Sequence, residues 1–134
     1  MGARQTFHLA GAEHKAPIPA GVRIGNLLFS SAINGKDPDT GTYPPDAAGQ
    51  AKAAFANMAQ LVADAGGSTD HIAHVTVFLA DRAHREHVDR EWLAMFPDPD
   101  DRPARHAVET SRPGAGLLQL EIVAVLPDRT EADA

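Results

Sequence analysis

The chain has 134 residues, with 18 acidic and 12 basic side chains, a formal net charge of −6 and no cysteine. This length suits a single domain with a sizeable core, and the lack of cysteine excludes disulfides, a thiol nucleophile and thiolate metal sites. The acidic balance and the scattered basic residues argue against a nucleic acid partner. No apolar run approaches the length of a membrane span, and the first residues lack the regions of a signal peptide. We therefore expect a soluble, cytoplasmic protein with no membrane partner.

The first third of the chain is predicted to form short strands joined by loops. Residues 5–9 are weakly patterned as a strand, and the proline-rich segment 11–19 is predicted to be an extended loop that covers a surface or a cleft mouth. A Gly-Asn dipeptide at 25–26 separates apolar runs at 22–24 and 27–33. Such a dipeptide favours a tight turn, so these runs are predicted to form a β-hairpin.

Two helices are predicted in the middle of the chain. Apolar residues recur at the 3.6-residue period over 47–65, with Asp46 as the N-cap and a pair of glycines after the last turn. A second helix is predicted over 83–96, where Asp81 caps the start and Pro97 prevents continuation.

Three later segments are predicted as strands. Residues 70–80 alternate with apolar side chains on both faces, which indicates a central strand with Ala73 on one face and Ile72 on the other. Another strand is predicted to begin at about Pro103, because proline favours an extended predecessor but cannot donate a ladder hydrogen bond. The last strand is predicted over 117–126.

The order of these elements predicts an α+β fold, in which residues 1–134 form one mixed sheet with two helices on a single face. Residues 127–134 are predicted to be a flexible tail. The other face of the sheet also carries apolar side chains, among them Phe78, Val123 and Val125. Because this face is too apolar for water, we expect a second copy of the chain to cover it in an obligate homo-oligomer.

Arg105 is the candidate ligand anchor. Period-2 alternation puts Arg105, Ala107 and Glu109 on one face of the strand and His106 on the other. A guanidinium beside a small residue leaves room for a ligand, and its planar fork binds a carboxylate through two hydrogen bonds. The alternative is an arginine at a strand edge that pairs with one of the nearby acids, and the sequence leaves both interpretations open.

Seven histidines raise the question of a metal site, but their spacing does not support one. His71 and His74 fall on a predicted strand, where residues three apart point to opposite faces. His84 and His87 fall on a predicted helix, where they would converge but lack an obvious third ligand. We therefore expect no bound metal and no cofactor.

Several segments, taken together and in this order, resemble one known family. They are Phe29-Ser30-Ser31-Ala32, residues 37–41, the helical residues 55–66, residues 75–81, Pro103-Ala104-Arg105 and residues 120–125. In this combination the chain resembles the RidA/YjgF/UK114 family of reactive-intermediate deaminases over nearly its whole length. The resemblance implies a chorismate-mutase-like α+β fold, assembled as a homotrimer with clefts between subunits. It also implies hydrolysis of enamines and imines such as 2-aminoacrylate to a 2-oxo acid and ammonia.

The resemblance also assigns site positions. The family's arginine for the substrate carboxylate corresponds to Arg105, its neighbouring cysteine to Ala107, and the Ser-Gly pair that lines the cleft to Ser31 and Ala32. Three positions depart from the family pattern: the tyrosine of the first loop corresponds to Ile18, the asparagine of the second helix to Asp89, and the water-holding glutamate to Gln119.

The residue at position 119 bears most directly on the chemistry. An amide such as Gln119 orients a water molecule but does not exchange a proton at working pH. Glu121 lies on the same strand face, roughly 6.5–7 Å along the strand, and is the best remaining carboxylate. His14, which precedes a loop near the cleft, and His106 are further candidates, although surface positions remain the alternative for both and for Asp89.

Two classes of function follow from these residues. In the first, the protein is an enamine/imine deaminase, or a relative that uses the same arginine clamp for another hydrolysis or a tautomerisation. In the second, it binds a small 2-oxo or amino acid and regulates. Arg105 fits both classes, and the substitution at Gln119 weakens the first.

Overall fold

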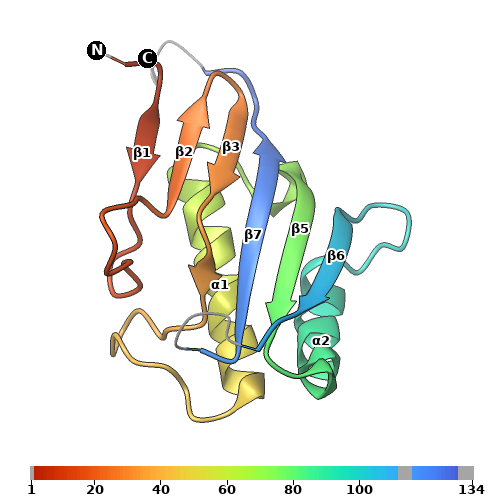
Figure 1. The fold of residues 1–134 in the computed structure, drawn as a ribbon. Helices are drawn as coiled ribbons and strands as arrows, with labels where there is room; N and C mark the ends of the chain where they lie inside the picture. Colours follow the sequence, from red (N-terminus) through yellow and green to blue (C-terminus); the bar gives the residue numbers. More distant parts are fainter. Residues whose placement is uncertain (1, 112–115, 130–134) are drawn as a thin grey trace.

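The computed structural model describes residues 2–111 and 116–129 (Figure 1). Most of the predicted C-terminal tail, residues 130–134, lies outside the described part of the chain. In chain order the elements are β1 (Gln5–Phe7), β2 (Gly21–Ile24), β3 (Leu27–Ser30), β4 (Ile33–Asn34), α1 (Ala47–Asp64), β5 (Ile72–Leu79), α2 (Arg85–Met95), β6 (Ala104–Glu109) and β7 (Leu118–Val125). Short 3₁₀ turns at Thr69–His71 and Arg82–His84 precede β5 and α2.

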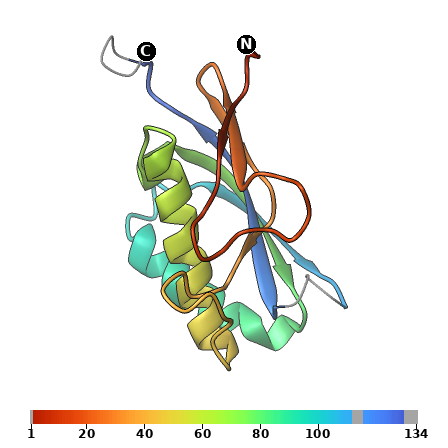
Figure 2. The same cartoon turned by 90° about the vertical axis from the view of Figure 1, so that its left-hand side faces the viewer.

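The strands form one mixed sheet in the order β1-β2-β3-β7-β5-β6, and β4 pairs with β7 beyond the end of β3. The β5–β6 pair is parallel, and the other pairs are antiparallel. Both helices cover the same face of the sheet, as the view in Figure 2 shows. This arrangement confirms the predicted α+β fold, and β5 is an interior strand between β7 and β6 as predicted.

Helix α1 contributes more buried side chains to the core than α2 does, and its local sequence explains its bounds. The Asp46 side chain accepts a hydrogen bond from the Gly49 amide at 2.8 Å, which satisfies one free donor of the first turn. The chain leaves the helix after Ala65 through Gly66, whose φ of 98° suits a residue without a side chain. The buried stripe comprises Ala51, Ala54, Phe55, Met58, Leu61 and Val62.

Two β-bulges correct the predicted strand pattern. The pairing of β5 with β7 shifts register between Ile72 and His74, so Ile72 is buried on the helix side and Ala73 is exposed, the reverse of the prediction. The strand predicted over 27–33 is also interrupted: the three residues 30–32 lie opposite only two residues of β7, which separates β3 from β4. Both irregularities arise from the register with β7, a strand distant in the sequence. The local alternation of apolar and polar residues therefore does not predict them.

The sheet face opposite the helices, here called the open face, is apolar over the β2–β3 hairpin and the end of β7. Four side chains on this face, Ile24, Leu27, Phe29 and Val125, are between 41% and 51% exposed. Leu27 lies directly opposite Val125, and Phe29 lies opposite Val123, so these side chains form one continuous patch. Contiguous apolar surface of this kind favours contact with another protein surface. No helix within the described ranges is long and apolar enough to cross a membrane.

Candidate functional site

Arg105 lies on β6, at the edge of the sheet, and points to the helix side. The β5–β6 register places it beside Val75, whose side chain is buried under the helices. Its guanidinium carbon lies 4.9 Å from the ring centroid of Trp92 on α2, and its Nη2 donates to Asp89 Oδ1 at 2.7 Å. We call Arg105, Asp89 and Trp92 the Arg105 cluster. Contact with a ring face and a carboxylate fixes the plane of the guanidinium fork.

The Arg105 cluster is only partly satisfied. The arginine side chain is 17% exposed and the Asp89 side chain 45% exposed, so the ion pair lies at the border of the solvent. Arg105 Nη1 is buried and has no hydrogen-bond partner among the described residues. A buried donor without a partner costs on the order of 1–3 kcal/mol, which an oxygen acceptor from outside the chain would recover. The described chain thus contains the ion pair that the sequence offered as an alternative, together with one free donor on the same guanidinium.

The neighbours of Arg105 alternate as the sequence predicts. Ala107 faces the helix side and packs against the core. His106 lies opposite Thr76 on the open face and is exposed, so it does not share a surface with the guanidinium. Glu109 returns to the helix side, where its Oε2 accepts a hydrogen bond from the Arg82 amide at 2.9 Å.

Gln119 lies in a cavity of about 330 Å³ on the other side of the sheet, which we call the Gln119 cavity. The first loop, β4, the loop after β4 and the start of β7 all contribute to it, because Asn34 pairs with Gln119 across the β4–β7 ladder. The described residues that line it are Glu13, His14, Lys15, Asn34, Lys36, Tyr43 and Gln119.

Two buried asparagine side chains join the elements that form this cavity. Asn57 on α1 donates from its Nδ2 to the carbonyls of Asn34 at 3.0 Å and Lys36 at 2.9 Å. The Asn34 side chain accepts from the Lys36 amide at 3.0 Å and donates to the Ala12 carbonyl at 3.3 Å. These bonds join α1, the first loop and the start of the loop after β4, so the backbone that carries Lys36 is fixed before any ligand arrives.

The charged and titratable side chains of the cavity differ in their electrostatic surroundings. The Lys36 Nζ lies 5.7 Å from the centroid of the Tyr43 ring, within reach of a cation–π contact. Burial raises the pKa of Tyr43 above its ordinary value, so the hydroxyl remains a hydrogen-bond donor. Hydrogen bonds from the backbone amides of Glu13 and Gly11 lower the pKa of Glu13, with smaller contributions from Lys36 and His8. Glu13 is therefore a carboxylate, and the cavity holds two ammonium groups against one carboxylate.

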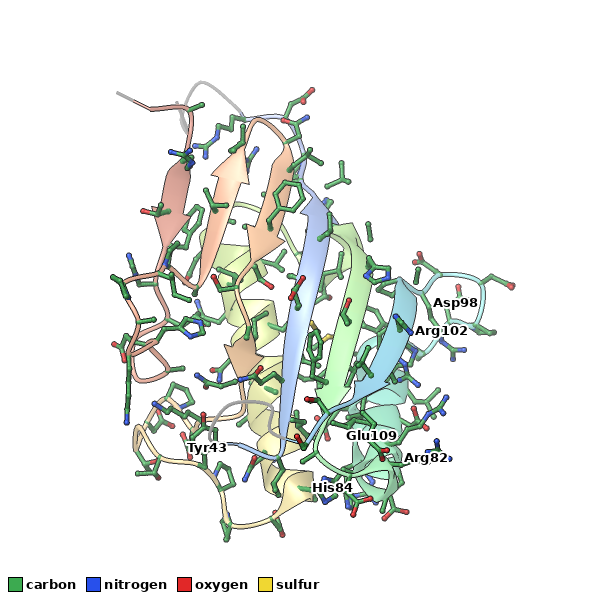
Figure 3. All side chains as sticks on the ribbon, viewed as in Figure 1. Tyr43, Arg82, His84, Asp98, Arg102 and Glu109 are labelled. Atoms are coloured by element: carbon green, nitrogen blue, oxygen red, sulfur yellow. The ribbon has the colours of Figure 1, made fainter. Side chains whose placement is uncertain are left out.

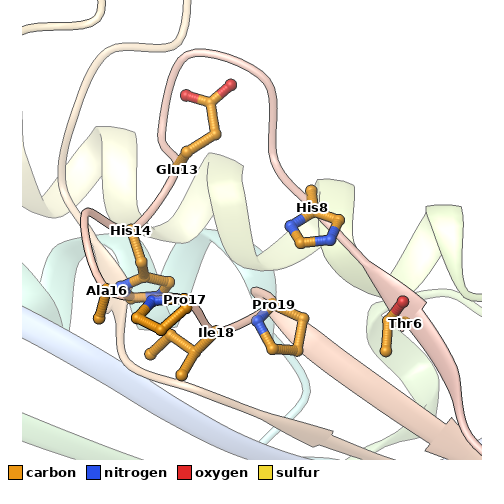
Figure 4. Close-up of a pocket in the computed structure, with 8 residues that line it drawn as sticks. All are labelled: Thr6, His8, Glu13, His14, Ala16, Pro17, Ile18 and Pro19. Carbon is orange, nitrogen blue, oxygen red and sulfur yellow. The ribbon is translucent and has the colours of Figure 1, made fainter.

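Of the other predicted residues, His14 lines this cavity, Glu121 lies on β7, and Ser31 and Ala32 lie between β3 and β4. Glu121 lies on the same face of β7 as Gln119 and is exposed opposite Thr76. Ser31 and Ala32 lie half-buried in the bulge between β3 and β4. His14 lines the Gln119 cavity and also a neighbouring cavity of about 260 Å³, which Ile18 lines as well (Figure 4).

Within one chain, the Arg105 cluster and the Gln119 cavity lie apart. The Arg105 side chain lies on the helix side of β6, Gln119 lies on the other face of β7, and β5 separates the two strands. Figure 3 shows Tyr43, from the Gln119 cavity, and Glu109, from the end of β6, on opposite sides of β7. Each chain therefore presents the Arg105 cluster and the Gln119 cavity on different surfaces, and we refer to these two regions as half-sites.

Sequence reasoning missed Trp92 as a neighbour of Arg105, and it missed Lys36, Tyr43 and Glu13 as cavity residues. Lys36 and Tyr43 belong to a loop with no periodic pattern, and they meet Gln119 only through the β4–β7 pairing. The signal that was present is the polar residue Asn34 directly after the apolar run 27–33, where a core strand would continue with an apolar residue.

Comparison with known proteins identifies the family. A family model described as Endoribonuclease L-PSP matches residues 13–126. The chain belongs to this family, the RidA/YjgF family. This confirms the relationship that the sequence motifs indicated.

Named relatives cover most of the chain. The 2-iminobutanoate/2-iminopropanoate deaminase of Escherichia coli is 32% identical over 111 residues, which are 81% of this chain and 87% of the relative. A RutC family protein of Pyrococcus abyssi is 32% identical over 117 residues, with coverages of 82% and 91%. Imine deaminases are thus among the relatives, although others are named only as RutC family proteins.

Solved structures share the fold. The YjgF gene product of Escherichia coli superposes with a TM-score of 0.80 at 31% identity, covering 90% of this chain and 98% of that one. RidA from an Antarctic Psychrobacter species gives a TM-score of 0.81 at 25% identity, with coverages of 94% and 100%. These values establish a RidA-like fold over at least 90% of the chain.

Proposed function

We propose that the protein hydrolyses small enamines and imines that carry a carboxylate, giving a 2-oxo acid and ammonia. Relatives named as 2-iminobutanoate/2-iminopropanoate deaminases support this reaction class. The observation that carries the proposal is the free Nη1 donor of Arg105, on a guanidinium that Trp92 and Asp89 hold in one plane. Such a donor suits a substrate carboxylate that approaches beside Asp89.

We further propose that the working site forms between two copies in a homotrimer. In this arrangement the Arg105 cluster of one chain faces the Gln119 cavity of its neighbour, since the two half-sites of one chain point to different surfaces. The apolar patch on the open face supplies the contact between copies. Ser31, Ala32 and His14 would then line the cleft on the Gln119 side, and Ala107 would lie beside the substrate carboxylate at Arg105.

The proposed chemistry is a hydration followed by elimination. An enamine first takes a proton at carbon and loses one from nitrogen, which gives the imine. Water then adds to the C=N carbon, so that a C–O bond forms; the C–N bond breaks, both water protons end on nitrogen, and ammonia leaves. In this scheme Gln119 orients the water through its amide, while Glu121, two residues further along the same face of β7, accepts and returns a proton.

One observation favours a second candidate function. The side chain of Gln119 is neutral, so this position of β7 carries no carboxylate. A protein that binds a small carboxylate and regulates through it needs the arginine clamp but no proton exchange. Under this alternative the chain would bind 2-oxo acids without turning over the corresponding imines.

The experiment that tests the proposal measures release of ammonia from 2-iminobutanoate generated in situ, together with calorimetric binding of 2-oxobutanoate. Arg105→Lys keeps the charge but removes the planar fork, so we expect affinity and kcat/KM to fall by an amount on the order of 1.5–3 kcal/mol, about ten- to a hundredfold. Folding should persist, because lysine keeps a cation beside Asp89 and Trp92.

Arg102→Lys is the matched control. Its guanidinium donates to the carbonyls of Phe96 and Pro97 in the loop before β6 and does not belong to either half-site. We expect this variant to keep the wild-type rate. Equal losses in both variants would contradict the role of Arg105. Binding that depends on Arg105 without any turnover would support the regulatory alternative instead.

A further inference from the structure

The charged and polar side chains that line the Gln119 cavity point to a particular class of substrate. If the proposed function holds, Arg105 takes the carboxylate beside the C=N group, and the cavity of the neighbouring chain receives the rest of the molecule. In 2-aminoacrylate and 2-iminobutanoate that remainder is a methylene or a short alkyl group, which prefers apolar contacts. Yet none of the seven described residues that line the cavity has an aliphatic or purely hydrocarbon aromatic side chain.

The charge of the cavity favours an anion. Lys15 and Lys36 face one carboxylate, Glu13, in a chain whose net charge is −6. Glu13 already accepts a hydrogen bond from the Gly11 amide at 3.1 Å. Within residues 2–111 and 116–129, neither lysine ammonium forms an ion pair within 4 Å, and Lys36 acts on Glu13 only as a smaller, longer-range contribution that lowers its pKa. The cavity therefore holds one more cationic group than its single carboxylate balances.

Lys36 is the better placed of these two cations. Its backbone is tied to Asn34 and Asn57, and its ammonium is held near the Tyr43 ring at 5.7 Å, whereas Lys15 is exposed on the loop. The neutral donor beside it is the Tyr43 hydroxyl, while the Gln119 amide is left to orient the water of the proposed reaction. An ammonium with a hydroxyl donor beside it is a set that binds a carboxylate.

We infer that the preferred substrate is a short dicarboxylic imine or enamine, whose second carboxylate binds Lys36 in the Gln119 cavity while Arg105 of the adjacent copy binds the first. This inference rests on the proposed function and adds the substrate class to it. Hydrolysis proceeds as above: water supplies the new carbonyl oxygen, ammonia leaves, and the product is a 2-oxo dicarboxylic acid. The cavity volume, about 330 Å³, lies in the range of small-ligand sites.

The test compares hydrolysis of 2-iminosuccinate and 2-iminoglutarate with that of 2-iminobutanoate, each generated in situ by an amino-acid oxidase. For the wild type we expect a kcat/KM at least about tenfold higher for one of the two dicarboxylic imines, as one charge-assisted hydrogen bond allows. Lys36→Met removes the ammonium at similar size, so this preference should disappear, because the two dicarboxylic imines lose more kcat/KM than 2-iminobutanoate does. Lys36→Arg should retain the preference.

Lys52→Met, on the exposed side of α1, is the matched control and should behave as the wild type. Circular dichroism establishes that each variant is folded. A wild type without preference for either dicarboxylic imine would overturn the inference, and so would an equal loss on all three imines in Lys36→Met. Calorimetric titration with 2-oxoglutarate and 2-oxobutanoate distinguishes failure of the proposed function from failure of this inference. If no imine is hydrolysed, the proposed function fails. The cavity assignment then stands only if 2-oxoglutarate binds more tightly and Lys36→Met removes that difference.

Discussion

The side chain at position 119 decides whether a proton can be exchanged at this point of the cavity. Gln119 sits opposite Asn34 at the start of β7, in a cavity that also holds two lysines, so its surroundings would favour a negative charge that the amide does not carry. An amide orients water through one acceptor and two donors, but proton transfer must then use another group. Glu121 is exposed on the same strand face, two residues further on.

Gln119→Glu should therefore retain or raise the turnover of 2-aminoacrylate generated in situ. The new carboxylate would meet the water directly, and a well-placed general base contributes about 10²–10⁴-fold when no other group does that work. The measurement is the initial rate of pyruvate formation. Gln5→Glu, which adds the same charge at an exposed position of β1, should not change this rate. A large loss in a folded Gln119→Glu protein would mean that position 119 serves a different chemistry.

The position of the Arg105 strand was predictable from the sequence, but the contacts of Arg105 were not. Alternation and Pro103 predicted where the Arg105 strand begins and which residues share its face, and the structure confirms both. The contact with Asp89 was not predictable, because it depends on how α2 packs against the edge of the sheet. Lys36 and Tyr43 were missed for a related reason: loop residues carry no period, so their neighbours follow only from the tertiary structure.

At the scale of elements, Arg23 joins three parts of the fold. It is buried on β2, 3% exposed, and donates to the carbonyls of Gly25 at 2.8 Å, Ala65 at 2.6 Å and Pro127 at 3.0 Å. The bond to Ala65 satisfies a free carbonyl at the C-terminal end of α1, where the helix dipole also favours a cation. The hairpin turn, the end of α1 and the end of β7 thus share one guanidinium.

Arg23→Gln should lower the free energy of unfolding by about 2–4 kcal/mol, because a shorter neutral side chain leaves buried carbonyls without donors. Urea denaturation followed by circular dichroism measures this change. Arg90→Gln, at an exposed position of α2, serves as the control and should stay within about 0.5 kcal/mol of the wild type. A similarly small change in Arg23→Gln would show that solvent replaces the lost hydrogen bonds.

The elements themselves were largely predictable, and the exceptions share one cause. Periodicity and capping residues place α1 within one residue of its observed end, and Asp81 precedes α2 through a short 3₁₀ turn. The errors are the bulge at Ala73 and the break between β3 and β4. Both depend on the register with β7, a strand at the far end of the sequence, and local patterns do not encode such a register.

In the whole molecule, the two candidate binding regions of one chain lie apart. The Arg105 cluster and the Gln119 cavity lie on different faces of one sheet, and the open face carries a continuous apolar patch around Leu27 and Phe29. A second copy placed on this face would cover the patch and bring unlike half-sites together. In the proposed trimer, closed rotational symmetry would make every cleft use Arg105 from one chain and Gln119 from the next.

A complementation experiment tests this shared site. The wild type should have a mass in solution close to three chains of 14.2 kDa each. Arg105→Lys damages one half-site, and Gln119→Phe fills the other, so each variant alone should show little imine hydrolysis. When the two variants are coexpressed and mix at random, about a quarter of the clefts pair an intact Arg105 with an intact Gln119, and activity should recover to about that fraction. Coexpression of Arg105→Lys with Arg105→Ala is the control and should restore nothing, because every cleft then has a damaged arginine. A wild-type monomer at micromolar concentration, or mixed trimers that remain inactive, would show that one chain does not lend its arginine to another.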